Sequence, residues 1–140
     1  IYMRLYNVNG KLVYKSVGKK RIKWKGKSRS KLQLKVKNFL QPYWKNHIVF
    51  EEFPVYGTRM SVDFLNATKK IAIEVNGKQH SEFVKFFHGS RLDYYKSISR
   101  DVNKAEWLEK NGFELLELEE KDVKNLSIDY LKEEFGIYIA

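Results

Sequence analysis

The fold is decided by one stretch, residues 60–80, whose sequence is MSVDFLNATKKIAIEVNGKQH. Two runs in this stretch alternate apolar and polar residues, which indicates β-strands because successive strand side chains point to opposite faces. Residues 67–70 suit a tight turn between them, so we expect an antiparallel pair. The predicted apolar face carries Met60, Val62, Phe64, Ile71, Ile73 and Val75.

The same alternation places Asp63 and Glu74 together on the other face, and a register that sets them opposite each other fits the turn length. Like charges in that position destabilise a sheet, so they require a cation, a shared proton or open solvent. The functional interpretation is a divalent metal ion, because such ions bind carboxylate oxygens. The alternative is a solvated polar face, since exposed strand faces often carry acidic residues.

The length and composition narrow the class of protein. A chain of 140 residues fits one domain with a substantial core. It contains no cysteine, which excludes a disulfide scaffold, a zinc–thiolate site and thiol catalysis within it. No apolar run approaches the roughly 18 residues that span a membrane, and no signal peptide is visible. We therefore expect a cytoplasmic protein.

Positive charge is concentrated in the first part of the chain. Residues 1–50 contain 14 Lys and Arg and no Asp or Glu, whereas residues 51–140 contain 13 Lys and Arg and 17 Asp and Glu. This imbalance predicts a surface for a polyanion, with nucleic acid as the leading candidate. Lysine and arginine would neutralise phosphates, and a tryptophan would stack on a base or sugar. The predicted contacts are Lys19, Lys20, Arg21, Lys23, Trp24, Lys25, Lys27 and Arg29. The alternative is a solvated basic loop with Trp24 packed on the core.

Further elements follow from periodicity and capping residues. They are a hairpin over residues 4–15 with a two-residue turn at Asn9-Gly10, a helix from the N-cap Ser30 to about 43, a strand over 47–55, a helix over about 91–110 ended by Asn111-Gly112, a strand over 113–119, and a last helix between Ser127 and Gly136. In the first helix, the buried face would carry Leu32, Val36, Phe39 and Leu40, and the other faces Lys31, Lys35 and Lys37. We expect an N-terminal hairpin and basic arm, residues 1–29, attached to an α/β core, residues 30–140.

Asp63, Glu74 and His80 lie within 18 residues of one another, and a glycine turn can bring His80 over the carboxylates. Metal-assisted hydrolysis of a phosphodiester needs two or three oxygen ligands and a group that handles the proton of the attacking water. The side chains of Asp63 and Glu74 and the backbone carbonyl of Val75 would supply the ligands. His80 would orient or deprotonate the water, and Lys78 would stabilise phosphate charge. The alternative for His80 is a histidine in a surface turn.

The pattern of Asp63 followed by Glu74-x-Asn-Gly-x-x-His80 resembles the PD-(D/E)XK nuclease superfamily. It is most similar to the branch near the very-short-patch repair endonucleases and the related phage-encoded homing endonucleases. Arg100-Asp101 and Asn111-Gly112-Phe113 match the later part of that branch, so the resemblance covers about residues 30–120. It implies a restriction-endonuclease-like core with a mixed β-sheet flanked by helices, a Mg²⁺ cofactor for which Mn²⁺ can substitute, and DNA as the partner. It also implies a bacterial or phage-infected host cell.

The chain departs from the superfamily pattern at two places. The usual lysine two residues after the second acid is Asn76, which we expect on the same face as Glu74. An amide binds water or phosphate but carries no positive charge, so His80 or Lys78 would have to substitute. Related families also often carry a glutamate on the first helix, which has no acid here. Glu51 or Glu52 would fill that role, and strand alternation allows only one of them.

The resemblance also suggests a role for Asp101 on the flank of the long helix, where it would fix the orientation of His80. The alternative is a salt bridge from Asp101 to Lys104 or Arg100. The sequence as a whole predicts a Mg²⁺-dependent DNA endonuclease of homing or nicking type, which would need a homodimer to break both strands. The alternatives are a non-enzymatic nucleic-acid-binding module on a decayed nuclease fold and a structure-selective junction resolvase.

Overall fold

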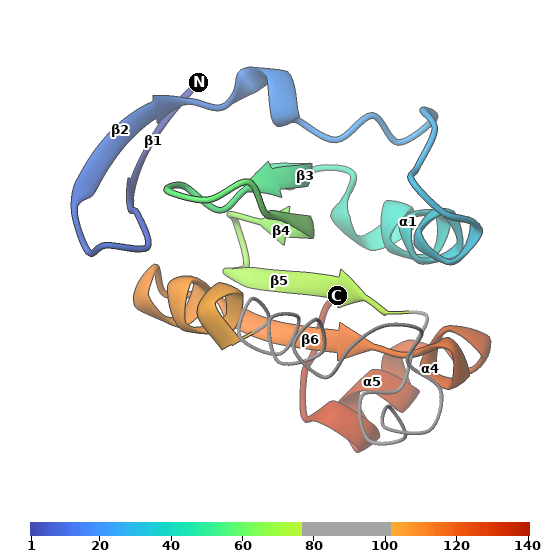
Figure 1. Cartoon of the computed structure of the whole chain (residues 1–140). Helices are drawn as coiled ribbons and strands as arrows, with labels where there is room; N and C mark the ends of the chain where they lie inside the picture. The colour runs from blue at the N-terminus through green and yellow to red at the C-terminus, as the bar shows by residue number, and fades with distance from the viewer. Residues whose placement is uncertain (77–101) are drawn as a thin grey trace, which may run out of the picture.

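The computed structural model describes residues 1–76 and 102–140. A mixed sheet forms its centre, with four strands in the order β3-β4-β5-β6 (Figure 1). The strands are β3 (Val49–Pro54), β4 (Ser61–Asn66), β5 (Ile71–Val75) and β6 (Glu114–Leu118). β3, β4 and β5 form an antiparallel meander, and β6 pairs parallel with β5. The predicted α/β fold, with a mixed sheet flanked by helices and an N-terminal hairpin, is confirmed.

Both faces of the sheet are covered. One face packs against α1 (Lys31–Trp44), α4 (Glu120–Lys124) and α5 (Ile128–Phe135) in a cluster that contains Leu40, Phe64 and Leu131. The other face packs against the hairpin of β1 (Tyr2–Tyr6) and β2 (Leu12–Ser16) and against helical residues 102–110, in a cluster that contains Leu5 and Trp107. No helix in the described ranges is long and apolar enough to cross a membrane.

The helix boundaries follow the capping residues. Ser30 accepts a hydrogen bond from the amide of Gln33 at 3.1 Å, and Ser127 accepts one from the amide of Tyr130 at 2.9 Å. Gly136 ends α5 in the left-handed conformation, with φ of 69°. These two predicted helices are confirmed, whereas α4 was not predicted. Its signal is a capping box between Glu119 and the residue three positions later.

The N-terminal hairpin has a longer loop than the predicted two-residue turn. The Asn7 amide donates to the Lys11 carbonyl at 2.8 Å, which leaves three residues between these positions. The Asn7 side chain accepts from the amides of Asn9 and Lys11 at 2.9 and 3.0 Å, and Gly10 has φ of 83°. A three-residue hairpin with glycine in the left-handed region is a common solution, and the asparagine at its first position stabilises it.

The predicted single apolar face of β4 is wrong. Phe64 packs with the cluster that contains Leu40, whereas Val62 packs with the opposite cluster around Leu5. The neighbouring strand shows a matching irregularity, because Phe50 and Phe53 lie three positions apart yet share one cluster, with ring centroids 5.2 Å apart. Regular alternation is therefore interrupted at the centre of both strands.

The basic arm, residues 19–29, is held along the edge of the sheet beside β3 (Figure 1). The Ile22 amide donates to the Val49 carbonyl at 2.9 Å, and Arg21 forms an isolated bridge with Phe50. Ile22 is buried, and Trp24 is half-buried against the same cluster. The arm is thus an ordered edge segment, and the tryptophan packs on the core as the alternative interpretation expected.

Candidate functional site

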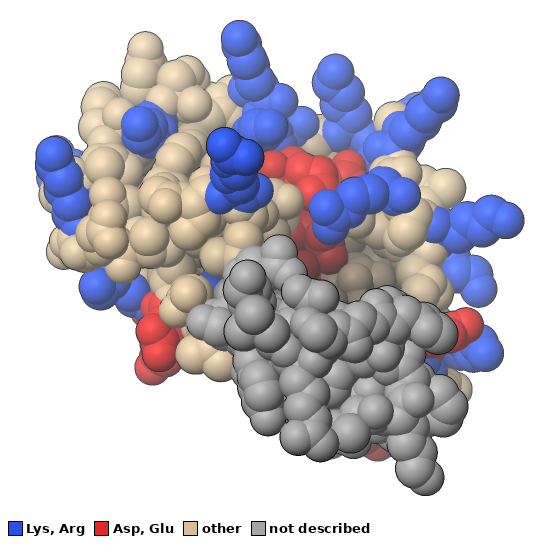
Figure 2. Space-filling model, in the orientation of Figure 1, with Lys and Arg blue, Asp and Glu red and all other residues tan. Residues whose placement is uncertain are grey.

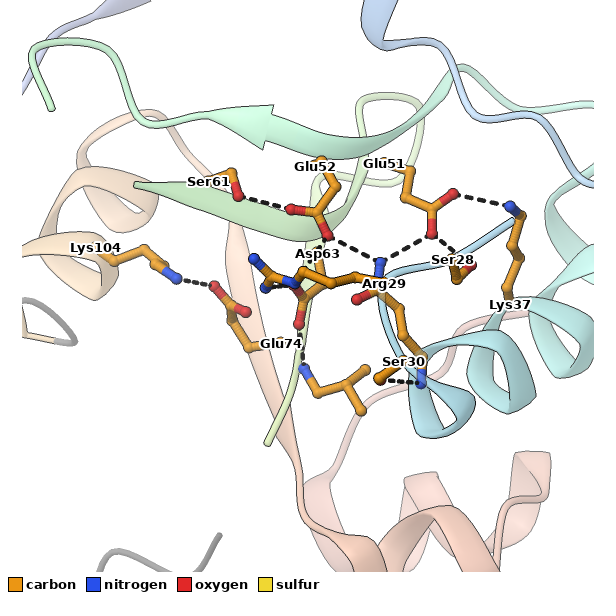
Figure 3. Close-up of polar contacts among 12 residues, drawn as sticks. Ser28, Arg29, Ser30, Lys37, Glu51, Glu52, Ser61, Asp63, Glu74 and Lys104 are labelled. Carbon is orange, nitrogen blue, oxygen red and sulfur yellow. Dashed lines mark hydrogen bonds and ion pairs between the residues drawn. The ribbon is translucent and has the colours of Figure 1, made fainter. Parts of the chain in front are cut away.

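Four carboxylates converge where two strands part (Figure 3). They come from β3 (Glu51 and Glu52), β4 (Asp63) and β5 (Glu74). The pairing between β4 and β5 extends only as far as Phe64 and Ile73, although both strands continue beyond it. The next position would set Asp63 opposite Glu74. There the Val75 amide donates instead to the Asp63 carboxylate at 2.7 Å, so a side chain replaces the backbone ladder.

Asp63 and Glu74 are both buried, with 2% and 7% of their surface exposed, and their carboxyl groups share a hydrogen bond. Burial raises the pKa of Asp63 because it penalises the charged form. Burial and then the negative charge of Asp63 raise the pKa of Glu74 to about 8. At neutral pH a proton on Glu74 is therefore shared with Asp63. A shared proton is one of the three ways, with a cation and open solvent, in which two facing carboxyl groups are tolerated in a sheet.

Two cations contact this acidic pair from opposite parts of the chain (Figure 3). Arg29 Nη2 lies 3.1 Å from Asp63 Oδ1, and Arg29 Nε lies 3.6 Å from Glu52 Oε1. Lys104 Nζ lies 2.5 Å from Glu74 Oε1 as an ion pair, and among the described residues no donor is aligned for a hydrogen bond to that oxygen. Sequence reasoning assigned Arg29 to nucleic acid and considered Lys104 only as a partner of Asp101.

Glu51 and Glu52 both reach the cluster, so the expectation that only one could do so is wrong. Glu52 has φ of 55°, a left-handed conformation that breaks the strand alternation. The side-chain amide of Gln33 consequently donates to both carboxylates, at 2.8 Å to Glu51 and 3.1 Å to Glu52. Ser28 donates to Glu51 at 2.7 Å, and Ser61 donates to Glu52 at 2.8 Å.

Lys37, which was predicted on a face of α1 away from the core, is fully buried. Its ammonium group lies 2.9 Å from Glu51 Oε1 and donates to the carbonyls of Gly26 and Lys27 at 3.2 and 3.4 Å. The long apolar stem of lysine can cross a hydrophobic layer when its head group finds acceptors at the end. Lys37 therefore ties α1, the basic arm and β3 to one another behind the carboxylates.

Basic residues border the acidic cluster. Figure 2 shows acidic side chains near the middle of this face in a hollow, with lysines and arginines around them. A cavity of about 200 Å³ lies between the arm and Glu51 and Glu52. Six of the eight predicted nucleic-acid contacts line it, namely Lys19, Lys20, Arg21, Lys23, Lys27 and Arg29. The cavity thus combines a cationic rim with a carboxylate floor.

Three predicted catalytic residues, Lys78, His80 and Asp101, lie outside the described residues. Asn76 is described, and its amide donates to the Leu118 carbonyl at 2.7 Å. It lines a cavity of about 220 Å³ with Glu117, the β6 residue that pairs with Glu74. Within residues 1–76 and 102–140, no three acidic or histidine side chains are placed to hold one metal ion together.

Comparisons with known proteins identify two viral relatives. The chain is 32% identical over 80 residues to "Uncharacterized protein 033L" of Invertebrate iridescent virus 3, covering 57% of this chain and 41% of that protein. It is 38% identical over 66 residues to "Uncharacterized protein 094L" of Frog virus 3 (isolate Goorha), covering 46% and 43%. No family model matches the chain, and no solved structure matches it. The chain spans about two fifths of the length of the relatives that it matches.

Proposed function

We propose that this chain is a metal-dependent DNA endonuclease with a restriction-endonuclease-like core. The observation that carries the proposal is the convergence of Asp63, Glu74 and Glu52 at the point where β4 and β5 part, with Arg29 and Lys104 as counterions. Buried acids of this kind are costly in a structural role, and strongly shifted carboxyl groups cluster at functional sites. The cationic border supports a phosphate-bearing substrate.

The side chains present fit a divalent cation. Carboxylate oxygens are the ligands that Mg²⁺ and Mn²⁺ prefer, and Glu74 Oε1 is a buried carboxylate oxygen whose contact among the described residues is the Lys104 ammonium group. Asp63 and Glu74 would hold the ion, with Val75 contributing its carbonyl. When bound, the ion would polarise the phosphate and lower the pKa of water. Arg29 and Lys104 would then pair with phosphate oxygens, and Lys104 would supply the positive charge that Asn76 lacks.

A supercoiled plasmid tests this function. Wild type with Mg²⁺ or Mn²⁺ should nick the plasmid, whereas Asp63→Asn and Glu74→Gln should not. Glu114→Gln, an exposed residue at the start of β6, serves as the matched control and should nick normally. Equal background from wild type and both site variants would refute the proposal.

A non-enzymatic nucleic-acid-binding module is the second candidate. The contacts of Arg29 with Asp63 and of Lys104 with Glu74, together with Asn76 in the place of lysine, favour it. In that case the protein would bind DNA with a steep dependence on salt, yet metal ions would give neither cleavage nor measurable binding at the acidic pair.

The viral relatives support a role in a virus-infected cell. If the protein is a nuclease that cleaves both strands, it would need to act as a homodimer.

A further inference from the structure

The N-terminal hairpin has an aromatic face that no described residue covers. The side chains of the outer face are all exposed, whereas those of the inner face are buried or half-buried except Lys15. The outer residues are Tyr2, Arg4, Tyr6, Leu12, Tyr14 and Ser16. Tyr2 and Tyr14 are 62% and 67% exposed, and their rings stack with centroids 5.2 Å apart. A solvated strand face normally carries polar residues, so an outer face rich in rings indicates a binding surface.

The hairpin is held rigidly against the rest of the protein. The Tyr6 amide donates to Asn111 Oδ1 at 2.8 Å, and the Tyr6 carbonyl accepts from Trp107 Nε1 at 2.6 Å. The Val8 amide donates to the Tyr56 carbonyl at 2.9 Å. Leu5, on the inner face, is buried in the cluster that contains Trp107. The outer rings are therefore already in place before a partner arrives, which lowers the entropic cost of binding.

Charge indicates which partner fits this face. Residues 1–50 contain no acidic side chain, and the chain runs from the end of β2 into the basic arm beside β3 (Figure 1). The arm lines the cavity that contains Glu51 and Glu52. A polyanion that follows the arm would thus reach the hairpin. The bases of a duplex are stacked on one another and offer only their edges, whereas unpaired bases offer ring faces to aromatic side chains.

We propose that the outer face of the hairpin stacks unpaired nucleotides, so that the preferred ligand is DNA with a single-stranded segment beside a duplex. The half-buried ring of Trp24 is a poorer platform than the exposed rings of Tyr2 and Tyr14. That DNA of this kind is also the substrate that is cleaved rests on the proposed nuclease function, whereas the binding preference does not.

Fluorescence anisotropy in EDTA, where no cleavage occurs, tests the binding face. The probes are a single strand, a blunt duplex of the same sequence, and a fork that joins both. Wild type should bind the strand and the fork more tightly than the blunt duplex. Tyr14→Leu, which keeps an apolar strand residue but removes the ring, should weaken strand and fork binding about tenfold and leave duplex binding unchanged. Tyr14→Phe should retain wild-type affinity.

Tyr138→Leu is the matched control, because this tyrosine is also exposed, at 59%, and lies beside a cationic side chain, Lys69, as Tyr14 lies opposite Arg4. This variant should bind all three probes normally. An equal loss on duplex and single strand, or no loss on either, would overturn the proposal. So would a wild-type dimer in sedimentation that Tyr14→Leu dissociates, because a second copy would then cover the face. Failure of plasmid nicking would leave these binding results untouched.

Discussion

The guanidinium group of Arg29 lies on the Asp63 carboxylate, with Nη2 and Oδ1 3.1 Å apart, although the two side chains differ greatly in burial. The Arg29 side chain is 67% exposed, whereas that of Asp63 is 3% exposed. A cation with most of its surface in water loses little solvation energy when it moves. Arg29 is therefore placed as a displaceable counterion that a metal ion could replace and a phosphate could attract.

Removing this counterion should have opposite effects on metal binding and on catalysis. Arg29→Ala should bind Mn²⁺ up to about fivefold more tightly, because an exposed ion pair is worth at most about 1 kcal/mol. The same variant should nick plasmid more slowly, because it lacks a phosphate contact. Isothermal titration calorimetry without DNA measures the first effect. Lys25→Ala, at an exposed lysine of the same arm, should leave Mn²⁺ affinity unchanged. An equal gain in Mn²⁺ affinity in both variants would mean that the loss of one positive charge, and not the loss of the Arg29–Asp63 contact, causes the effect.

The raised pKa of Glu74 predicts that the metal-free protein loses stability as pH rises. The folded state binds a proton on Glu74 up to about pH 8, while the unfolded carboxyl has its ordinary pKa of 4.5. Between these values the folded state holds more protons, so the free energy of unfolding falls with pH. Urea unfolding in EDTA at pH 5.5 and pH 8.5 measures the change. Glu74→Gln should show a clearly smaller fall, and an identical fall would contradict the shared proton.

The same proton should couple metal binding to pH. A divalent cation at Asp63 and Glu74 must displace the proton, because ligands bind as carboxylates. Mn²⁺ affinity should therefore increase from pH 6 to about pH 8, the pKa of Glu74, and then level off. Calorimetry in two buffers of different ionisation enthalpy would detect the released proton. A metal affinity that is constant over this range would exclude the buried pair as the binding site.

Local sequence signals predicted most of the fold. Ser30, Ser127 and Gly136 marked helix ends because capping depends on residues within one turn. Strand periodicity also brought Asp63 and Glu74 together, since the length of the turn fixes the register of a meander. These features share one property, which is that their determinants lie close together in the chain.

The parts of the site that were missed depend on distant contacts. Lys104 meets Glu74 only because helical residues 102–110 pack beside β5, and no spacing in the sequence encodes that contact. The left-handed conformation of Glu52 has no signal in its residue type, because glycine and asparagine are the residues that usually adopt it. Lys37 has the helical spacing of an exposed lysine. Its burial depends on acceptors in the arm and in β3, which are distant in the sequence.

The buried pair of Lys37 and Glu51 gives a stability prediction that is independent of catalysis. Lys37→Met should destabilise the protein by about 3–5 kcal/mol, because it leaves the Glu51 carboxylate without its charged partner. Adding Glu51→Gln should recover much of that loss, since the uncompensated charge is removed and Ser28 can still donate to the amide oxygen. Lys35→Met, at an exposed position of the same helix, should change stability by less than about 0.5 kcal/mol. Chemical denaturation of wild type, Lys37→Met, Glu51→Gln and the double variant completes the cycle. Additive effects of the two buried substitutions would mean that Lys37 and Glu51 are not energetically coupled.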